Sequence, residues 1–128
     1  MNNIQKTYGN YAGKIWKILE DEGPQVSTKL INQTDLSKED FYGAIGWLAR
    51  ENKIRKDKRT FSLGETNLVD EIGEKAGKVW NVLSTRNDID VTAIARLSKI
   101  SKEDCYSALG WLAREGKISA KLTVRKKK

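Results

Sequence analysis

The sequence predicts a mainly α-helical protein with small β-hairpins, built as two tandem copies of one module. Residues 9–54 and 73–118 align without a gap at a constant offset of 64, and 21 of the 46 aligned positions are identical. In each copy three segments carry apolar residues at helical spacing, and a short segment typical of a hairpin follows the third. We therefore predict two modules, residues 1–64 and 65–128.

The first segment of each module has the pattern of a core-facing amphipathic helix. The predicted helices cover residues 10–22, where Gly23 and Pro24 end the pattern, and about residues 67–84. Their apolar positions are Ala12, Ile15, Trp16 and Leu19 in the first copy, and Ala76, Val79, Trp80 and Leu83 in the second. Trp16 and Trp80 are interpreted as core residues, because aromatic side chains at this spacing usually pack inside.

A brief strand at residues 25–27 and a short second helix are predicted next. Thr28 suits an N-cap, since its hydroxyl can accept a hydrogen bond from a backbone N–H of the first turn, and the same residue recurs as Thr92. The second helices are predicted to end near residues 34 and 98. Each has only about two turns, so its stability must come from packing.

The third helix is predicted to begin after Ser37, or after Ser101 in the second copy. Asp40 and Asp104 lie three residues later, where a carboxylate complements the exposed N–H groups of the first turn. The helical projection places Phe41, Ile45 and Leu48 on the core face. It places Glu39, Gly43, Gly46 and Arg50 on the opposite, outward face.

The third helices are predicted to end at Asn52 and Gly116, the two residue types that best tolerate a left-handed C′ position. A hairpin follows in each copy. The first pairs residues 53–56 with 60–63 around a turn near residues 57–58, and the second pairs residues 117–120 with 122–124.

This order of elements describes a winged helix-turn-helix, in which the third helix is the recognition element and the hairpin is the wing. Two stretches also carry a family resemblance: Ala12-Gly13-Lys14-Ile15-Trp16, and the segment from Ala44 to Ile54 with Gly46-Trp47-Leu48-Ala49-Arg50-Glu51 at its centre. The chain resembles a small prokaryotic winged helix-turn-helix family of unassigned function. The resemblance implies the fold, and DNA binding only by analogy. Members of that family are usually single modules, so the tandem arrangement is a departure.

The net charge of +7 lies in two clusters that follow the third helices. Residues 55–59 contribute +3 and residues 125–128 contribute +4. We therefore predict a DNA-binding protein, with transcription regulation as its role, that contacts the backbone of double-stranded DNA through basic wings and third helices. The expected nucleic-acid-binding residues are Lys38, Arg50, Lys53, Arg55, Lys56, Lys58, Arg59, Lys102, Arg114, Lys117, Lys121, Arg125, Lys126 and Lys127. The alternative is that the two basic clusters form a solvated loop and a solvated tail that bind no partner.

Two features weaken base-specific reading by the third helix. Its first turn carries acids in both copies, and glycines occupy outward positions where base-reading side chains would be expected. Gly46, Trp47, Gly110 and Trp111 form a second predicted site, an interface. The outer tryptophan packs either under its own wing or in a contact with the other module or a second chain. The second hypothesis is therefore a protein-interaction module, with a protein partner or a homodimer formed through this face.

An enzyme, a metal protein and a membrane protein are disfavoured by composition. The chain has no histidine and one cysteine, and neither a nucleophile with its base nor a phosphate-binding loop is evident. We expect no cofactor and no metal. Cys105 aligns with Phe41 on the core face and is predicted to be buried. No apolar run approaches the roughly 20 residues of a membrane span, so a cytoplasmic location is expected.

Overall fold

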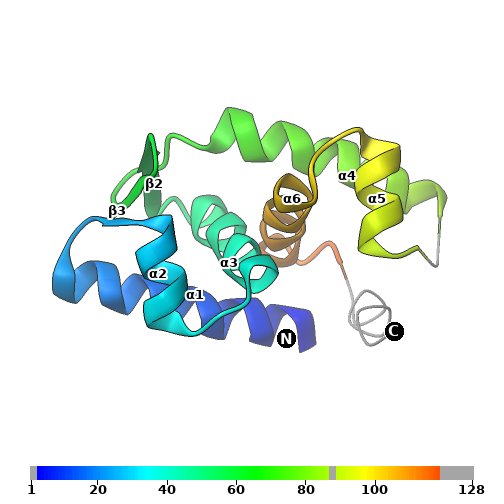
Figure 1. Cartoon of the computed structure of the whole chain (residues 1–128). Helices are drawn as coiled ribbons and strands as arrows, with labels where there is room; N and C mark the ends of the chain where they lie inside the picture. Colours follow the sequence, from blue (N-terminus) through cyan, green and yellow to red (C-terminus); the bar gives the residue numbers. More distant parts are fainter. Residues whose placement is uncertain (1–2, 87–88, 119–128) are drawn as a thin grey trace.

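The computed structural model describes residues 3–86 and 89–118. Helices α3 and α6 lie side by side at the centre, with α1 beside α3 and α4 beside α6 (Figure 1). The first module comprises α1 (Asn3–Glu22), β1 (Gln25–Val26), α2 (Ser27–Thr34), α3 (Lys38–Arg50), β2 (Ile54–Asp57) and β3 (Thr60–Leu63). The second comprises η1 (Val69–Gly73), α4 (Glu74–Thr85), α5 (Val91–Ser98) and α6 (Lys102–Arg114). The predicted fold class, mainly helical with a small antiparallel sheet, is confirmed.

Helix α1 begins well before its predicted start. Ile4 and Tyr8 extend the apolar stripe toward the N-terminus, and both are buried. The added turns reach the second module, where the Gln5 side-chain amide donates to the Ala113 carbonyl oxygen at 3.1 Å. In the second module the first helix opens with the π-helical turn η1 and continues as α4.

The predicted core positions of Trp16 and Trp80 need correction. Ile15 and Val79 are fully buried at the centre of the apolar stripes of α1 and α4. The tryptophan that follows each of them lies at the edge of the stripe, so Trp16 is half-buried and Trp80 is 38% exposed. Trp80 is therefore not a core residue.

The predicted threonine caps are wrong, whereas the serine caps are confirmed. Helix α2 already begins at Ser27, so Thr28 lies inside its first turn, and α5 is capped by Asp90, whose carboxylate accepts from the Ala93 N–H at 2.8 Å. For α3 and α6, Ser37 and Ser101 accept from the backbone N–H groups three residues later, at 3.1 and 3.0 Å. Serine succeeds because it lies directly before the first helical residue.

The first hairpin forms as predicted. Strand β3 lies between β1 and β2 in an antiparallel sheet, and Asp57 pairs with Thr60 across the two-residue turn Lys58-Arg59. Asn52 and Gly116 both adopt positive φ, 61° and 75°, as predicted for the ends of the third helices. The predicted second hairpin lies outside the described residues, apart from Lys117 and Ile118.

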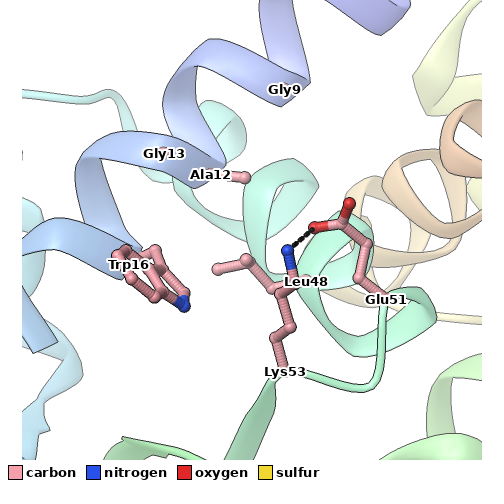
Figure 2. Close-up of a pocket in the computed structure, with 7 residues that line it drawn as sticks. All are labelled: Gly9, Ala12, Gly13, Trp16, Leu48, Glu51 and Lys53. Carbon is pink, nitrogen blue, oxygen red and sulfur yellow. Dashed lines mark ion pairs between the residues drawn. The ribbon is translucent and has the colours of Figure 1, made fainter. Parts of the chain in front are cut away.

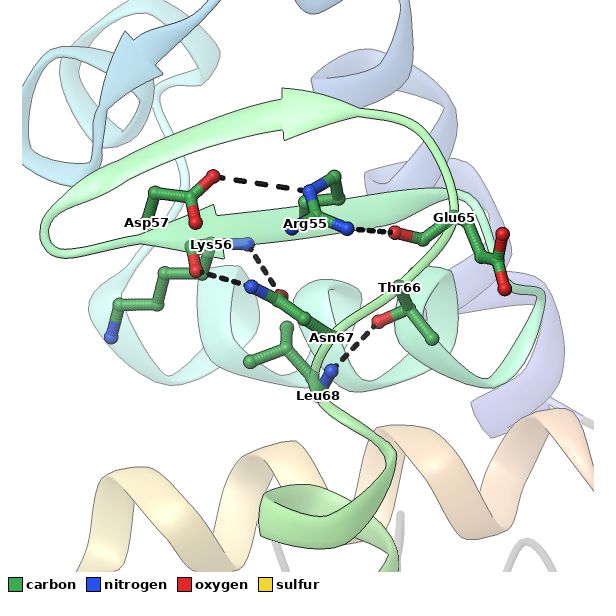
Figure 3. Close-up of polar contacts among 7 residues, drawn as sticks. All are labelled: Arg55, Lys56, Asp57, Glu65, Thr66, Asn67 and Leu68. Atoms are coloured by element: carbon green, nitrogen blue, oxygen red, sulfur yellow. Dashed lines mark hydrogen bonds and ion pairs between the residues drawn. The ribbon is translucent and has the colours of Figure 1, made fainter.

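The segment between the modules is fixed to the wing of the first one. The Asn67 side chain accepts from the Lys56 N–H at 3.0 Å and donates to the Lys56 carbonyl oxygen at 2.8 Å, as a neighbouring strand would (Figure 3). Arg55 donates to the Glu65 carbonyl oxygen at 3.0 Å. Buried apolar residues of both modules belong to one core cluster. The two modules are thus packed together and not merely tethered.

Candidate functional site: the paired third helices and the first wing

Helices α3 and α6 are in backbone contact through glycine. A Cβ atom added to Gly46 would overlap the carbonyl oxygen of Ser107, and one added to Gly110 would overlap the carbonyl oxygen of Gly43. Only glycine permits this approach. The face of α3 that was predicted to point outward is therefore buried against α6, because the second module supplies its covering.

The two helices run in the same direction and are related by an approximate twofold axis. At their N-terminal ends Lys38 pairs with Glu103 at 2.7 Å. At their C-terminal ends Arg50 pairs with Glu115 and Arg114 pairs with Glu51, both at 3.0 Å. Adding 64 to or subtracting 64 from the residue numbers converts the Arg50–Glu115 pair into the Arg114–Glu51 pair. The modules therefore contact each other as the subunits of a symmetric dimer do.

Trp47 and Trp111 lie in this contact between modules. Trp47 is 8% exposed, and a Cβ atom on Gly9 of α1 would come within 3.3 Å of its ring. The Arg114 guanidinium lies 5.6 Å from the Trp47 ring centroid, and Arg50 lies 5.7 Å from that of Trp111. Each tryptophan thus lies between its own first helix and an arginine of the other module.

Four of the predicted nucleic-acid-binding residues meet at the C-terminal ends of α3 and α6. Lys53 lies 3.7 Å from Glu51, and Lys117 lies 3.6 Å from Glu115. Arg50 and Arg114 share the same two carboxylates, as described above. We call these six residues the charge belt. Sequence reasoning missed the two glutamates as site residues, although each follows its arginine directly in both copies.

The N-terminal ends of the third helices carry more acids than expected for a DNA-reading surface. Lys38 is engaged by Glu103, and a hydrogen bond from the ammonium to this carboxylate raises the pKa of Lys38. Asp104 holds Lys75 at 2.8 Å, while Lys102 is exposed. Carboxylates at both helix starts repel phosphates, so this end is a poor reader of DNA.

The first wing carries the remaining predicted cations that the structure describes. The Arg55 side chain is 41% exposed and lies 3.9 Å from Asp57 (Figure 3). The Lys56 ammonium lies 5.6 Å from the Phe61 ring centroid. Lys58 and Arg59 form the turn, and both are exposed. Within the described ranges neither of these two forms an ion pair. Lys121, Arg125, Lys126 and Lys127 lie outside the described residues.

A groove of about 310 Å³ lies between α1 and the C-terminal end of α3. Trp16 forms one side, and Leu48 and Lys53 form the other (Figure 2). The complete lining is Gly9, Ala12, Gly13, Trp16, Leu48, Glu51 and Lys53. Every one of these residues recurs 64 positions later, as Gly73, Ala76, Gly77, Trp80, Leu112, Glu115 and Lys117.

Cys105 is fully buried on the core face of α6, as predicted. Burial, with a smaller contribution from Asp104, raises the pKa of its thiol from 9.0 to about 12. The neutral thiol therefore stabilises the fold below about pH 9, and this contribution is lost as the pH rises toward 12.

We expect Cys105 to resist a thiol reagent in the folded protein at about pH 8, because the reactive thiolate is scarce and inaccessible. Spectrophotometric titration with a disulfide reagent should show little reaction before unfolding and one thiol per chain in urea. Rapid stoichiometric labelling of the folded protein would contradict this expectation.

Two kinds of feature are absent from the residues that the structure describes. No group of three or more potential metal-ligating side chains is found among them. None of the described helices has the length and apolarity required to span a membrane.

Comparison with known proteins identifies both modules. The family model "Winged helix-turn-helix domain (DUF2582)" matches residues 1–63 and again residues 67–127. No curated protein and no solved structure matches the chain.

Proposed function

Because this chain belongs to the winged helix-turn-helix domain family DUF2582, we propose that it binds the backbone of double-stranded DNA through its wings. The role is non-enzymatic. The third helices, which enter the major groove in many helix-turn-helix proteins, hold the two modules together here. Transcription regulation in the cytoplasm is the setting that we propose for this contact, by analogy of fold.

The observation that carries the proposal is the exposed turn Lys58-Arg59. The sheet register places these cations at the tip of the hairpin, and the backbone carbonyl of Arg59 accepts from the Ser27 N–H at 3.1 Å, which anchors the tip to the start of α2. An anchored pair of cations loses little conformational freedom on binding, so phosphate contacts are favoured. The predicted second cluster, Lys121, Arg125, Lys126 and Lys127, would serve the second module in the same way.

The alternative function, a protein-interaction module that uses the outer Gly-Trp face, loses support. In this chain α6 covers Gly46 and α3 covers Gly110. A partner would have to separate the modules to reach that face. The wing needs no such rearrangement to reach DNA.

A titration of labelled random-sequence duplex at two salt concentrations tests the proposal. We expect the joint substitution Lys58→Glu, Arg59→Glu to weaken binding strongly, because the wing tip would then repel the DNA backbone. The slope of log K against log salt should fall by about 1 for each phosphate that the protein no longer neutralises.

The matched control is the joint substitution Arg96→Glu, Lys99→Glu at the end of α5, which changes the net charge equally at exposed positions far from the wing (Figure 1). Equal weakening by both pairs would show that net charge alone matters and would refute the wing assignment. Binding that does not respond to salt would refute the backbone contact.

A further inference from the structure

The groove beside Trp16 and its counterpart beside Trp80, formed by the residues 64 positions later, have a composition that packing alone does not explain. All seven lining residues are identical in the two modules, whereas fewer than half of the aligned positions are identical overall. Each module keeps a large aromatic ring partly exposed at this position, half-buried for Trp16 and 38% exposed for Trp80. A single partly exposed ring is ordinary on a protein surface, but here the whole set of seven residues recurs together with the ring.

Gly13 and Gly77 strengthen this argument. A Cβ atom on either residue would meet no atom within 4 Å, so packing does not require glycine there. Glycine inside a helix is also less stable than alanine. Gly9 and Gly73 differ, since a Cβ atom on them would press against Trp47 and Trp111. Gly13 instead leaves the groove beside the Trp16 indole ring open for another molecule.

The charges around the grooves favour an anionic ligand. Lys53 forms part of one groove and Lys117 is its counterpart in the second module. The charge belt between them contains four cations and two carboxylates, because Arg50 and Arg114 bridge the ends of the third helices. The groove beside Trp16 and its counterpart beside Trp80 therefore adjoin one surface with excess positive charge.

We propose that the groove beside Trp16 and its counterpart beside Trp80 bind unpaired nucleotides of a single strand, with a base stacked on Trp16 or Trp80 and a phosphate on Lys53 or Lys117. A flat ring suits a groove bounded by an indole ring, Leu48 and the glycines of α1, and every base offers such a face. The charge belt provides a path for the backbone between the two sites. The inference rests on the proposed function in taking nucleic acid as the ligand, but it uses a different surface from the wing.

The first module holds the stronger site. In the second module the Lys117 ammonium lies 5.6 Å from the centroid of the Trp80 ring and covers its face. A base must displace this ammonium, which then meets the phosphate. Stacking on Trp16 requires no comparable displacement of Lys53, which pairs with Glu51 across the groove from the ring (Figure 2).

The test is a titration of the full chain with short oligothymidylate, followed by tryptophan fluorescence and by anisotropy of a labelled strand. We expect quenching in the parent protein. The joint substitution Gly13→Leu, Gly77→Leu adds a side chain beside each indole ring, at positions where a Cβ atom meets no other atom within 4 Å, and should weaken binding by about ten- to a hundredfold. The joint substitution Trp16→Leu, Trp80→Leu should do the same. Leu97→Ser removes an apolar side chain of similar exposure on α5 and should leave binding unchanged.

The outcomes separate this inference from the proposed function. Suppose that the leucine substitutions leave oligothymidylate binding unchanged while duplex binding still depends on the wing. That result refutes nucleotide binding in the grooves and leaves the proposed function of the wing standing. Oligothymidylate binding that the leucines abolish supports the grooves even where the duplex fails to bind. If free thymidine monophosphate binds as tightly as oligothymidylate, the proposal that the ligand is a nucleic-acid strand is refuted. No binding of either nucleic acid overturns both proposals.

Discussion

Replacing Gly46 with alanine is expected to destabilise the folded protein by about 3 kcal/mol, the upper part of the range for overpacking. The added methyl group would overlap the carbonyl oxygen of Ser107, which belongs to a rigid helix and cannot rotate away as a side chain would. Helices α3 and α6 must then separate, which also weakens the Arg50–Glu115 and Arg114–Glu51 pairs. Urea unfolding followed by circular dichroism measures the loss. Gly110→Ala should behave alike, since its Cβ atom would overlap the Gly43 carbonyl oxygen.

Gly13→Ala is the matched control, because it adds the same methyl group to a helix interior where nothing lies within 4 Å. It is expected to raise the free energy of unfolding by about 0.5 to 1 kcal/mol. If Gly46→Ala stabilised the protein as much as Gly13→Ala, the backbone contact between the third helices would be disproved.

A second large effect is expected at Gly43, where the two modules differ. A Cβ atom on Gly43 would overlap the Tyr8 ring, so Gly43→Ser should destabilise the protein by about 2 to 3 kcal/mol. The second module has Ser107 and Ile72 at the equivalent positions, and both line one cavity. Tyr8→Ile should therefore make room for the serine. We expect the double variant to be more stable than the sum of the single effects by about 2 kcal/mol.

The measurement is a double-mutant cycle in urea, with the reverse exchange as its control. Ile72→Tyr in the second module should be destabilising alone and should be rescued by Ser107→Gly. Additivity within about 0.5 kcal/mol in both cycles would mean that the two positions do not compensate each other.

The local structure followed from the sequence where its cause was local. Ser37 and Ser101 were identified as caps because the interaction spans only three residues, and the ends at Asn52 and Gly116 follow from the φ preferences of these residue types. Thr28 and Thr92 are wrong as predicted caps, because a threonine that precedes an apolar run can also lie inside the first turn of the helix. The start of α1 was missed because Ile4 and Tyr8 gain their partners only in the packed fold.

The candidate site could be predicted only in part from the sequence. The repeat singled out Gly46, Trp47, Gly110 and Trp111, but one helix alone cannot show what covers its outer face. The same limit affected Arg50 and Arg114, expected on a DNA-facing surface and found between the modules. Trp80 is predicted in the core because helical spacing shows which face of a helix is apolar, but it does not show whether a residue at the border of that face is buried.

Periodicity, capping and the repeat can be recognised in the sequence alone, which was therefore enough for the number of modules, the class of fold, the serine caps and the first wing. The packing of the two modules was needed to show that the third helices face each other, that their glycines permit backbone contact, and that the groove beside Trp16 adjoins the charge belt. The physical reason is that burial, close approach and ion pairing depend on residues more than 60 positions apart, which come together only when the two modules pack.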